Sequence, residues 1–126
     1  MKTPLRLVVA ILLLIALIAG AAIGSLWFRA WSLERADVAR DVERAVTRGD
    51  LRILGIEGAG LYLPGTDSAL YAAATAGRCP FRIIYVGDAF SLDLQRRVAE
   101  ASFRYATTYN RDLIARTGPA QLCTGR

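Results

Sequence analysis

The sequence contains no histidine, and Lys2 is its single lysine. Without histidine, the chain lacks the side chain that most often acts as a general base at neutral pH and most often binds transition metals. Its two cysteines, Cys79 and Cys123, do not form a C-x-x-C pair, and no histidine is present to complete a zinc site. We therefore expect the protein to bind no metal ion and no cofactor. The sequence also contains no known motif that would identify catalytic residues.

Positive charge is in moderate excess but is not gathered into a block. The 126 residues include 16 basic and 11 acidic side chains, and the arginines are spread along the chain. This pattern does not predict nucleic-acid binding. A long apolar run near the start leaves room for only one small domain. Such a domain buries little surface, so we expect a covalent cross-link or a binding partner to stabilise it.

The apolar run extends from Leu7 to Phe28 without a charged residue. As a helix it would span about 33 Å, which is enough to cross a hydrocarbon core of roughly 30 Å. A secretory signal is the alternative, because Lys2 and Arg6 precede the run and Ala19-Gly20-Ala21 matches an A-x-A cleavage site.

Aromatic residues at the end of the run favour an uncleaved anchor. Trp27, Phe28 and Trp31 flank Arg29, and indole rings prefer the headgroup level of a bilayer. We expect residues 1–28 to be a signal-anchor in the inner (cytoplasmic) membrane, with the carboxyl-terminal domain in the periplasm or outside the cell. Cleavage and the reverse orientation remain open, the latter because Arg29 and Arg35 nearly balance the charges before the run.

Small residues recur every four positions within the run, at Ala16, Gly20 and Gly24. This spacing allows two membrane helices to approach closely and predicts a helix dimer. A stripe that simply faces lipid is the alternative, since small residues are common in membrane helices.

Residues 29–49 are predicted to be a juxtamembrane stalk. The pattern from Ser32 to Arg48 is helical, the pairs Asp37/Arg40 and Asp41/Arg44 have i,i+3 spacing, and Gly49 is expected to end the helix.

Residues 50–126 are predicted to form a small α+β domain of the order β-β-α-β-α. The turn at Pro64-Gly65 closes one or two strands, and residues 66–77 have the pattern of a short helix. The apolar run 83–86 predicts a strand covered on both faces. Ser91 to Arg116 reads as a long helix, so helices would pack on a sheet of about three strands.

The two cysteines occupy positions at which a disulfide would hold the end of the chain to the sheet. Cys79 precedes the strong strand, and Cys123 lies in the tail after the last helix. In an oxidising compartment a Cys79–Cys123 disulfide would tie this tail to the sheet.

Two carboxylates suggest an enzyme alternative. Glu57 lies in a glycine-rich strand and Asp88 directly follows the strong strand, where active-site residues often occur in open sheets. Together they would suit a small periplasmic hydrolase or ligand-binding domain. The simpler interpretation is that Gly87-Asp88 forms a turn and Glu57 faces water.

The last helix carries a row of arginines at seven-residue spacing, Arg97, Arg104 and Arg111, with Phe103 and Ile114 expected to project away from the core. Interfaces favour aromatic residues and arginine. We therefore expect these five residues to bind a partner, although a solvated arginine face would look the same. The function predicted is a membrane-anchored accessory or protein-interaction module, with the bilayer and either a protein partner or a second copy as its partners.

Overall fold

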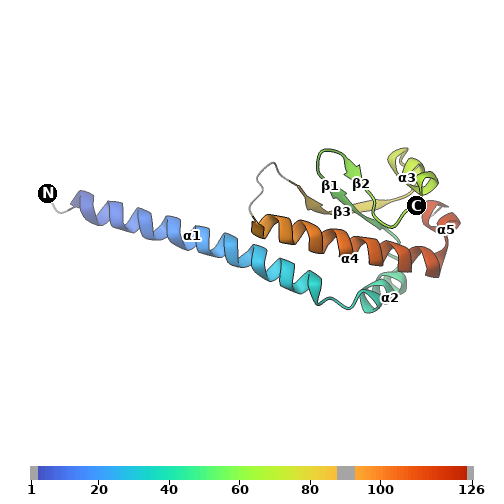
Figure 1. Cartoon of the computed structure of the whole chain (residues 1–126), viewed down its shortest axis with the longest axis horizontal. Helices are drawn as coiled ribbons and strands as arrows, with labels where there is room; N and C mark the ends of the chain where they lie inside the picture. The colour runs from blue at the N-terminus through green and yellow to red at the C-terminus, as the bar shows by residue number, and fades with distance from the viewer. Residues whose placement is uncertain (1–2, 88–92, 125–126) are drawn as a thin grey trace.

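The computed structural model describes residues 3–87 and 93–124. A long helix, α1 (Thr3–Glu34), projects from a small domain that contains the other elements (Figure 1). The amino terminus lies at the far end of this helix. The protein is thus of mixed helix and strand class with a long apolar helix at its start, as the sequence predicted.

Three strands form a sheet in the order β2-β1-β3. The central strand β1 (Ile53–Glu57) is antiparallel to the short β2 (Leu61–Tyr62) and parallel to β3 (Phe81–Val86). Helix α3 (Ser68–Thr75) lies in the connection from β2 to β3. Because β1 and β3 are parallel, their carboxyl ends meet at one edge of the sheet, where Glu57 pairs with Val86.

Helices cover both faces of the sheet and create two cores. Helix α4 (Asp93–Thr117) lies along one face, with α2 (Val38–Arg48) packed beside it (Figure 1). The buried residues of this larger core are Val42, Ala45, Leu54, Ile56, Ala106, Tyr109, Leu113 and Leu122. The other core, beneath α3 and next to α5 (Pro119–Thr124), contains Ile53, Leu63, Leu70, Ala74 and Cys79. Ile53 and Leu54 enter different cores because side chains alternate along a strand.

Strand β3 is covered less completely than the sequence predicted. Ile83, Ile84 and Tyr85 are half-buried, and Val86 keeps 66% of its surface exposed. The pairing of β1 with β3 shifts register between Gly55 and Ile56. The carboxyl end of β3 therefore retains an open, apolar surface.

The helix expected from Ser32 to Arg48 is in fact two helices. Helix α1 ends at Glu34, and α2 begins at Val38 with Asp37 as its N-cap, whose carboxylate accepts from the backbone N–H of Arg40. Gly49 ends α2 with a positive φ of 75°, as expected. Since Val42 and Ala45 are buried, α2 packs into the domain instead of extending the membrane-side helix.

The Cys79–Cys123 disulfide is present, which confirms the sequence prediction. It connects the segment before β3 to α5, a helix that the sequence did not predict. Leu122, beside Cys123, is fully buried in the larger core. The tail is thereby held both by the covalent bond and by packing.

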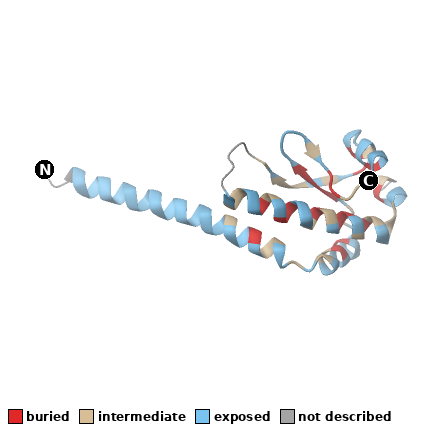
Figure 2. Cartoon of the chain, in the orientation of Figure 1, coloured by how far each residue is buried: buried red, intermediate tan, exposed pale blue. Residues whose placement is uncertain are grey.

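Towards the carboxyl end of α1, single residues become covered (Figure 2). Every residue from 4 to 25 is exposed, whereas Leu26 is half-buried and Ala30 has no exposed surface. Among the described residues, α1 is the one helix long and apolar enough to cross a membrane.

Candidate functional site

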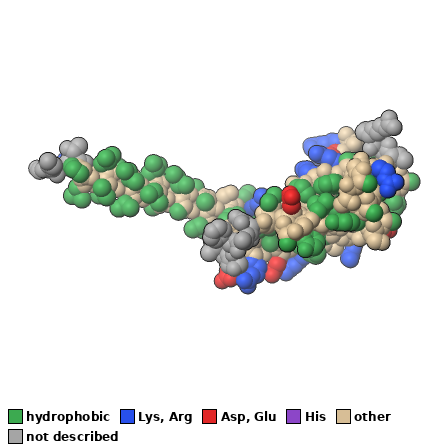
Figure 3. Space-filling model, turned by 90° about the horizontal axis from the view of Figure 1, so that it is seen from above, with side chains coloured by type: hydrophobic (Ala, Val, Ile, Leu, Met, Phe, Trp, Pro, Cys, Tyr) green, Lys and Arg blue, Asp and Glu red, His purple; other side chains and the backbone are tan. Residues whose placement is uncertain are grey.

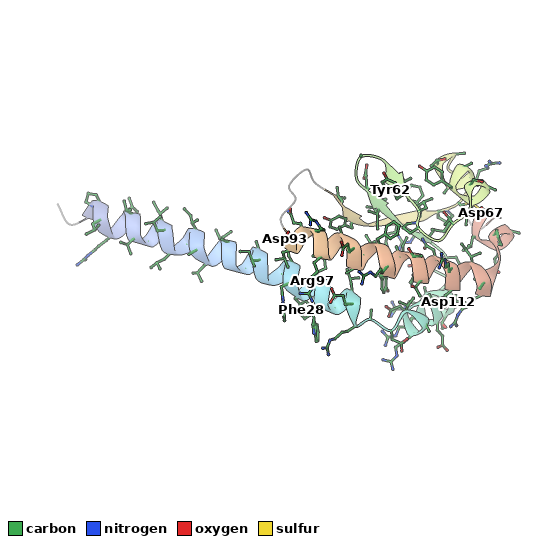
Figure 4. The ribbon with its side chains drawn as sticks, in the orientation of Figure 1. Phe28, Tyr62, Asp67, Asp93, Arg97 and Asp112 are labelled. Atoms are coloured by element: carbon green, nitrogen blue, oxygen red, sulfur yellow. A yellow bond between two sulfur atoms is a disulfide. The ribbon has the colours of Figure 1, made fainter. Side chains whose placement is uncertain are left out.

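The junction of α1 and α4 determines how the domain is attached to the apolar helix (Figures 1 and 4). Ala30 is buried where the two helices meet, and its small side chain permits close packing. Glu34 accepts two hydrogen bonds from Arg97, one from Nε and one from Nη2, both at 2.9 Å. Arg29 donates to the backbone carbonyl of Ile84. Thus α1 is bonded to both the helical layer and the sheet.

Arg97 was expected to face a partner, but the structure gives it a partner within the chain. The hydrogen bonds from Arg97 lower the pKa of the Glu34 carboxyl, and the carboxylate in turn raises the pKa of Arg97. A bidentate pair of this kind fixes orientation as well as charge. Arg97 therefore serves the α1–α4 junction.

The other residues of the predicted partner surface on α4 differ in exposure. Phe103 keeps 49% of its surface exposed, and Arg104 and Arg111 are also exposed. Arg104 lies 3.8 Å from Glu100 one turn away, a distance typical of a weak surface pair. We call Phe103, Arg104 and Arg111 the α4 surface.

Ile114 does not project away from the core, so that prediction is wrong. Its side chain is half-buried and packs against both cores. The helical pattern of α4 alone predicted a single covered face. The packing of α5 against both α4 and α3 widens the covered side at this end of the helix.

The carboxylates considered for catalysis lie at the edge where β1 and β3 end. The Glu57 side chain is exposed, and its backbone carbonyl accepts a hydrogen bond from the N–H of Gly87 at 2.5 Å. Asp88 lies outside the described residues. In residues 3–87 and 93–124, no group of three or more His, Cys, Asp or Glu side chains is placed to hold a metal ion.

A polar groove of about 240 Å³ lies between α2, β3 and α4, and we call it the arginine groove. It is lined by Asp41, Arg44, Ala45, Arg48, Asp50, Arg82, Tyr105 and Tyr109. Three elements distant in sequence contribute to it, which is why no single stretch of sequence identified it.

Both carboxylates of the arginine groove already have strong hydrogen-bond donors. The Tyr105 hydroxyl donates to Asp41 at 2.5 Å, and Arg52 donates twice to Asp50, at 2.7 and 3.1 Å. Burial, together with the bond to Asp41, raises the pKa of Tyr105. The bonds from Arg52 lower the pKa of Asp50. Both carboxylates thus already have hydrogen-bond donors within the chain.

Three arginines of the same groove, Arg44, Arg48 and Arg82, have no carboxylate at ion-pair distance within the described part of the chain. Guanidinium groups bind carboxylate and phosphate oxygens through paired N–H donors. The expected Asp37/Arg40 and Asp41/Arg44 ion pairs are not among those formed by the described residues. The part of the groove that the sequence could have indicated is the four-residue spacing of Arg44 and Arg48 on α2.

Comparison with family models, curated proteins and solved structures found no match for the chain.

Proposed function

We propose that the chain is a single-pass membrane protein whose disulfide-linked domain lies outside the cytoplasm and acts as an accessory or protein-interaction module. Apolar side chains cover the face of the free part of α1 that Figure 3 shows, while charged side chains lie on the domain. The sequence has no charged residue from 7 to 28, so the other faces are uncharged as well. A helix that is apolar all round is stable in lipid and unstable in water. Its uncharged segment, Leu7 to Phe28, matches the thickness of a bilayer.

One observation carries this proposal. The uncharged run of α1 ends at Phe28, and the domain begins to cover the helix at Leu26. The free part of α1 thus coincides with the part that would lie in lipid. Helix α1 also continues without a break through Ala19-Gly20-Ala21, so signal cleavage there would cut a continuous helix close to its contact with the domain.

The disulfide supports an extracytoplasmic domain. Bonds of this kind persist in the periplasm and outside the cell, whereas the cytoplasm keeps thiols reduced. With the domain outside, the amino terminus would lie in the cytoplasm and α1 would cross the inner membrane once.

Two surfaces suit an acidic partner protein. The α4 surface offers an exposed aromatic ring beside arginines, a combination enriched at protein interfaces. The arginine groove offers three guanidinium groups that lack carboxylate partners among the described residues. An acidic side chain of the partner would satisfy them.

A second copy of the chain is the partner proposed for the membrane segment. Ala16, Gly20 and Gly24 lie on the exposed part of α1, and a side chain added at either glycine would meet nothing within 4 Å. This leaves room for a neighbouring helix to approach closely.

Membrane extraction tests the proposed function. We expect the full chain to stay in the membrane pellet after a carbonate wash, and protease added to the outer side of the inner membrane to remove the domain. Release of the chain by carbonate, or protection of the domain from outside protease, would contradict the proposal.

A further inference from the structure

A second groove, of about 470 Å³, lies where α1 meets the domain. It is lined by Leu26, Arg29, Ile83, Ile84, Tyr85, Val86 and Gln95, which belong to α1, β3 and the first turns of α4. In the order β2-β1-β3, β3 is an edge strand, so its other side has no neighbouring strand in the described chain. We call this site the junction groove.

The walls of the junction groove are largely apolar, with one cation. Val86 is 66% exposed, and Leu26 is half-buried in the last part of the uncharged run. Arg29 bonds to the Ile84 carbonyl, but a guanidinium group has five N–H donors. No carboxylate of the described residues lies at ion-pair distance from it.

A residue that lines the groove carries an unsatisfied acceptor. The side-chain oxygen Oε1 of Gln95 is buried and accepts no hydrogen bond from any described residue. Such groups are rare in folded proteins, because a buried polar atom without a partner is costly. Two residues that line the groove thus lack a partner among the described residues: Arg29 has no carboxylate at ion-pair distance, and the buried Gln95 Oε1 has no donor.

We propose that the junction groove binds a phospholipid of the bilayer that α1 crosses, an inference that rests on the proposed function. The phosphate diester would bind Arg29. The Gln95 side chain would turn so that Oε1, which has no partner in the structure, accepts a hydrogen bond from an N–H or O–H donor of the headgroup. The acyl chains would leave the groove along Leu26 and follow the apolar surface of α1.

Position in the fold favours a lipid over a soluble anion. Leu26 and Arg29 flank the end of the uncharged run, which would lie at the headgroup level of the membrane. A free phosphate ion would satisfy Arg29 but would leave the apolar wall of the groove, including the exposed Val86, uncovered. A phospholipid matches both parts of the groove.

Headgroup chemistry gives a sharp test. The full chain is reconstituted in nanodiscs of phosphatidylcholine mixed with phosphatidylethanolamine or phosphatidylglycerol, and the lipids retained after gentle extraction are counted by native mass spectrometry. All three lipids carry a phosphate diester, but choline has no N–H or O–H donor. We expect several-fold preferential retention of the ethanolamine or glycerol lipid.

Two variants separate the two contacts. Arg29→Gln should lower retention of all three lipids, because each carries a phosphate group that the guanidinium would bind. Gln95→Leu should abolish only the preference for phosphatidylethanolamine over phosphatidylcholine, because these two lipids carry the same net charge and differ in their donors. Phosphatidylglycerol, which is anionic, would keep part of its preference through Arg29. The matched control is Arg35→Gln, because Arg35 lies one to two turns further along the same chain segment and stacks on Trp31, with its guanidinium carbon 5.1 Å from the ring centroid. Arg29→Lys should restore part of the retention.

Each possible result has a distinct meaning. Equal losses in Arg29→Gln and Arg35→Gln would indicate general attraction to the membrane and overturn the inference, as would loss of the preference on adding inorganic phosphate. A chain that enters nanodiscs but retains the three lipids equally would refute the groove alone. A chain that does not enter them would refute the proposed function. If Arg29→Gln fails to fold, Gln95→Leu still decides the matter.

Discussion

Asn110 of α4 bonds to Leu54 of β1 in the way that a neighbouring strand would. Its Oδ1 accepts from the Leu54 N–H at 2.8 Å, and its Nδ2 donates to the Leu54 carbonyl at 2.8 Å and to the Pro64 carbonyl at 2.7 Å. Strand β2 pairs with β1 only at Ile56 and Glu57, so a side chain supplies the missing pairing at Leu54. Asn110 is fully buried, and these bonds hold α4 to the sheet.

Asn110→Asp should therefore destabilise the domain strongly. The new carboxyl cannot supply both donors, so buried carbonyls lose their partners and a charge is buried beside them. We expect a loss of about 3 kcal/mol in the free energy of unfolding. Denaturant unfolding of the full chain in micelles would measure it, with the exposed Thr108→Ala on the same helix as a control expected to change stability by about 0.5 kcal/mol at most. Equal midpoints for Asn110→Asp and the unmodified chain would contradict this role.

Loss of the disulfide should also be costly. Cys79 and Cys123 are 44 positions apart, and closing a loop of that length contributes about 4 kcal/mol on the chain-entropy model. We expect Cys79→Ser/Cys123→Ser and the reduced chain to lose similar stability. Chain purified without reductant should weigh less than the reduced chain by two hydrogen atoms. Two thiols that react with maleimide in unfolded, unreduced protein would refute the bond.

The Glu34–Arg97 pair predicts a specific acid sensitivity. Arg97 holds the pKa of Glu34 below its ordinary value of 4.5. The stabilisation is therefore present above that value and is lost as the pH falls through the lower pKa of the folded chain. Glu34→Gln should be less stable than the unmodified chain at pH 7, and the two melting temperatures should converge in acid. A difference in melting temperature that persists unchanged at about pH 3 would contradict this account. Glu43→Gln on α2 is the control for the loss of one negative charge.

Phe103→Ser should impair partner binding with little effect on folding. About half of the ring is exposed, so we expect a stability loss of about 1 kcal/mol or less. Crosslinking in intact cells would compare it with Arg82→Gln in the arginine groove and with Glu57→Gln. The enzyme alternative is correct if two results occur together. The chains with Phe103→Ser and Arg82→Gln would crosslink to partners normally, and the chain with Glu57→Gln would fold but lose the activity of the protein in cells.

Self-association in the membrane should depend on the small residues of α1. Gly20→Ile/Gly24→Ile would hold two helices apart and should weaken dimerisation in a membrane reporter assay. Leu13→Ile/Leu17→Ile, on the same exposed segment, is the matched control. An unchanged signal in the glycine double variant would mean that this stripe merely faces lipid.

Local patterns predicted much of this fold. The apolar helix, the strand from Phe81 to Val86 and the helix end at Gly49 follow from residue types within a short window. The disulfide followed from the position of two cysteines. Ser91, where the last long helix was predicted to begin, lies outside the described residues.

Features that depend on distant segments could not be predicted. Arg97 looked free because its partner, Glu34, lies on another helix, and Ile114 looked exposed because α5 was not foreseen. Asp41 was assigned to Arg44 on its own helix, yet it accepts from Tyr105 on α4. In each case a tertiary contact replaced the partner that sequence spacing suggested.

The central claim is that α1 remains attached and holds the domain at the membrane. Its most direct test is the intact mass of the mature chain recovered from carbonate-washed membranes. We predict a mass that includes residues 1–28, whereas a chain beginning near Ala22 would contradict the account and identify the segment as a cleaved signal.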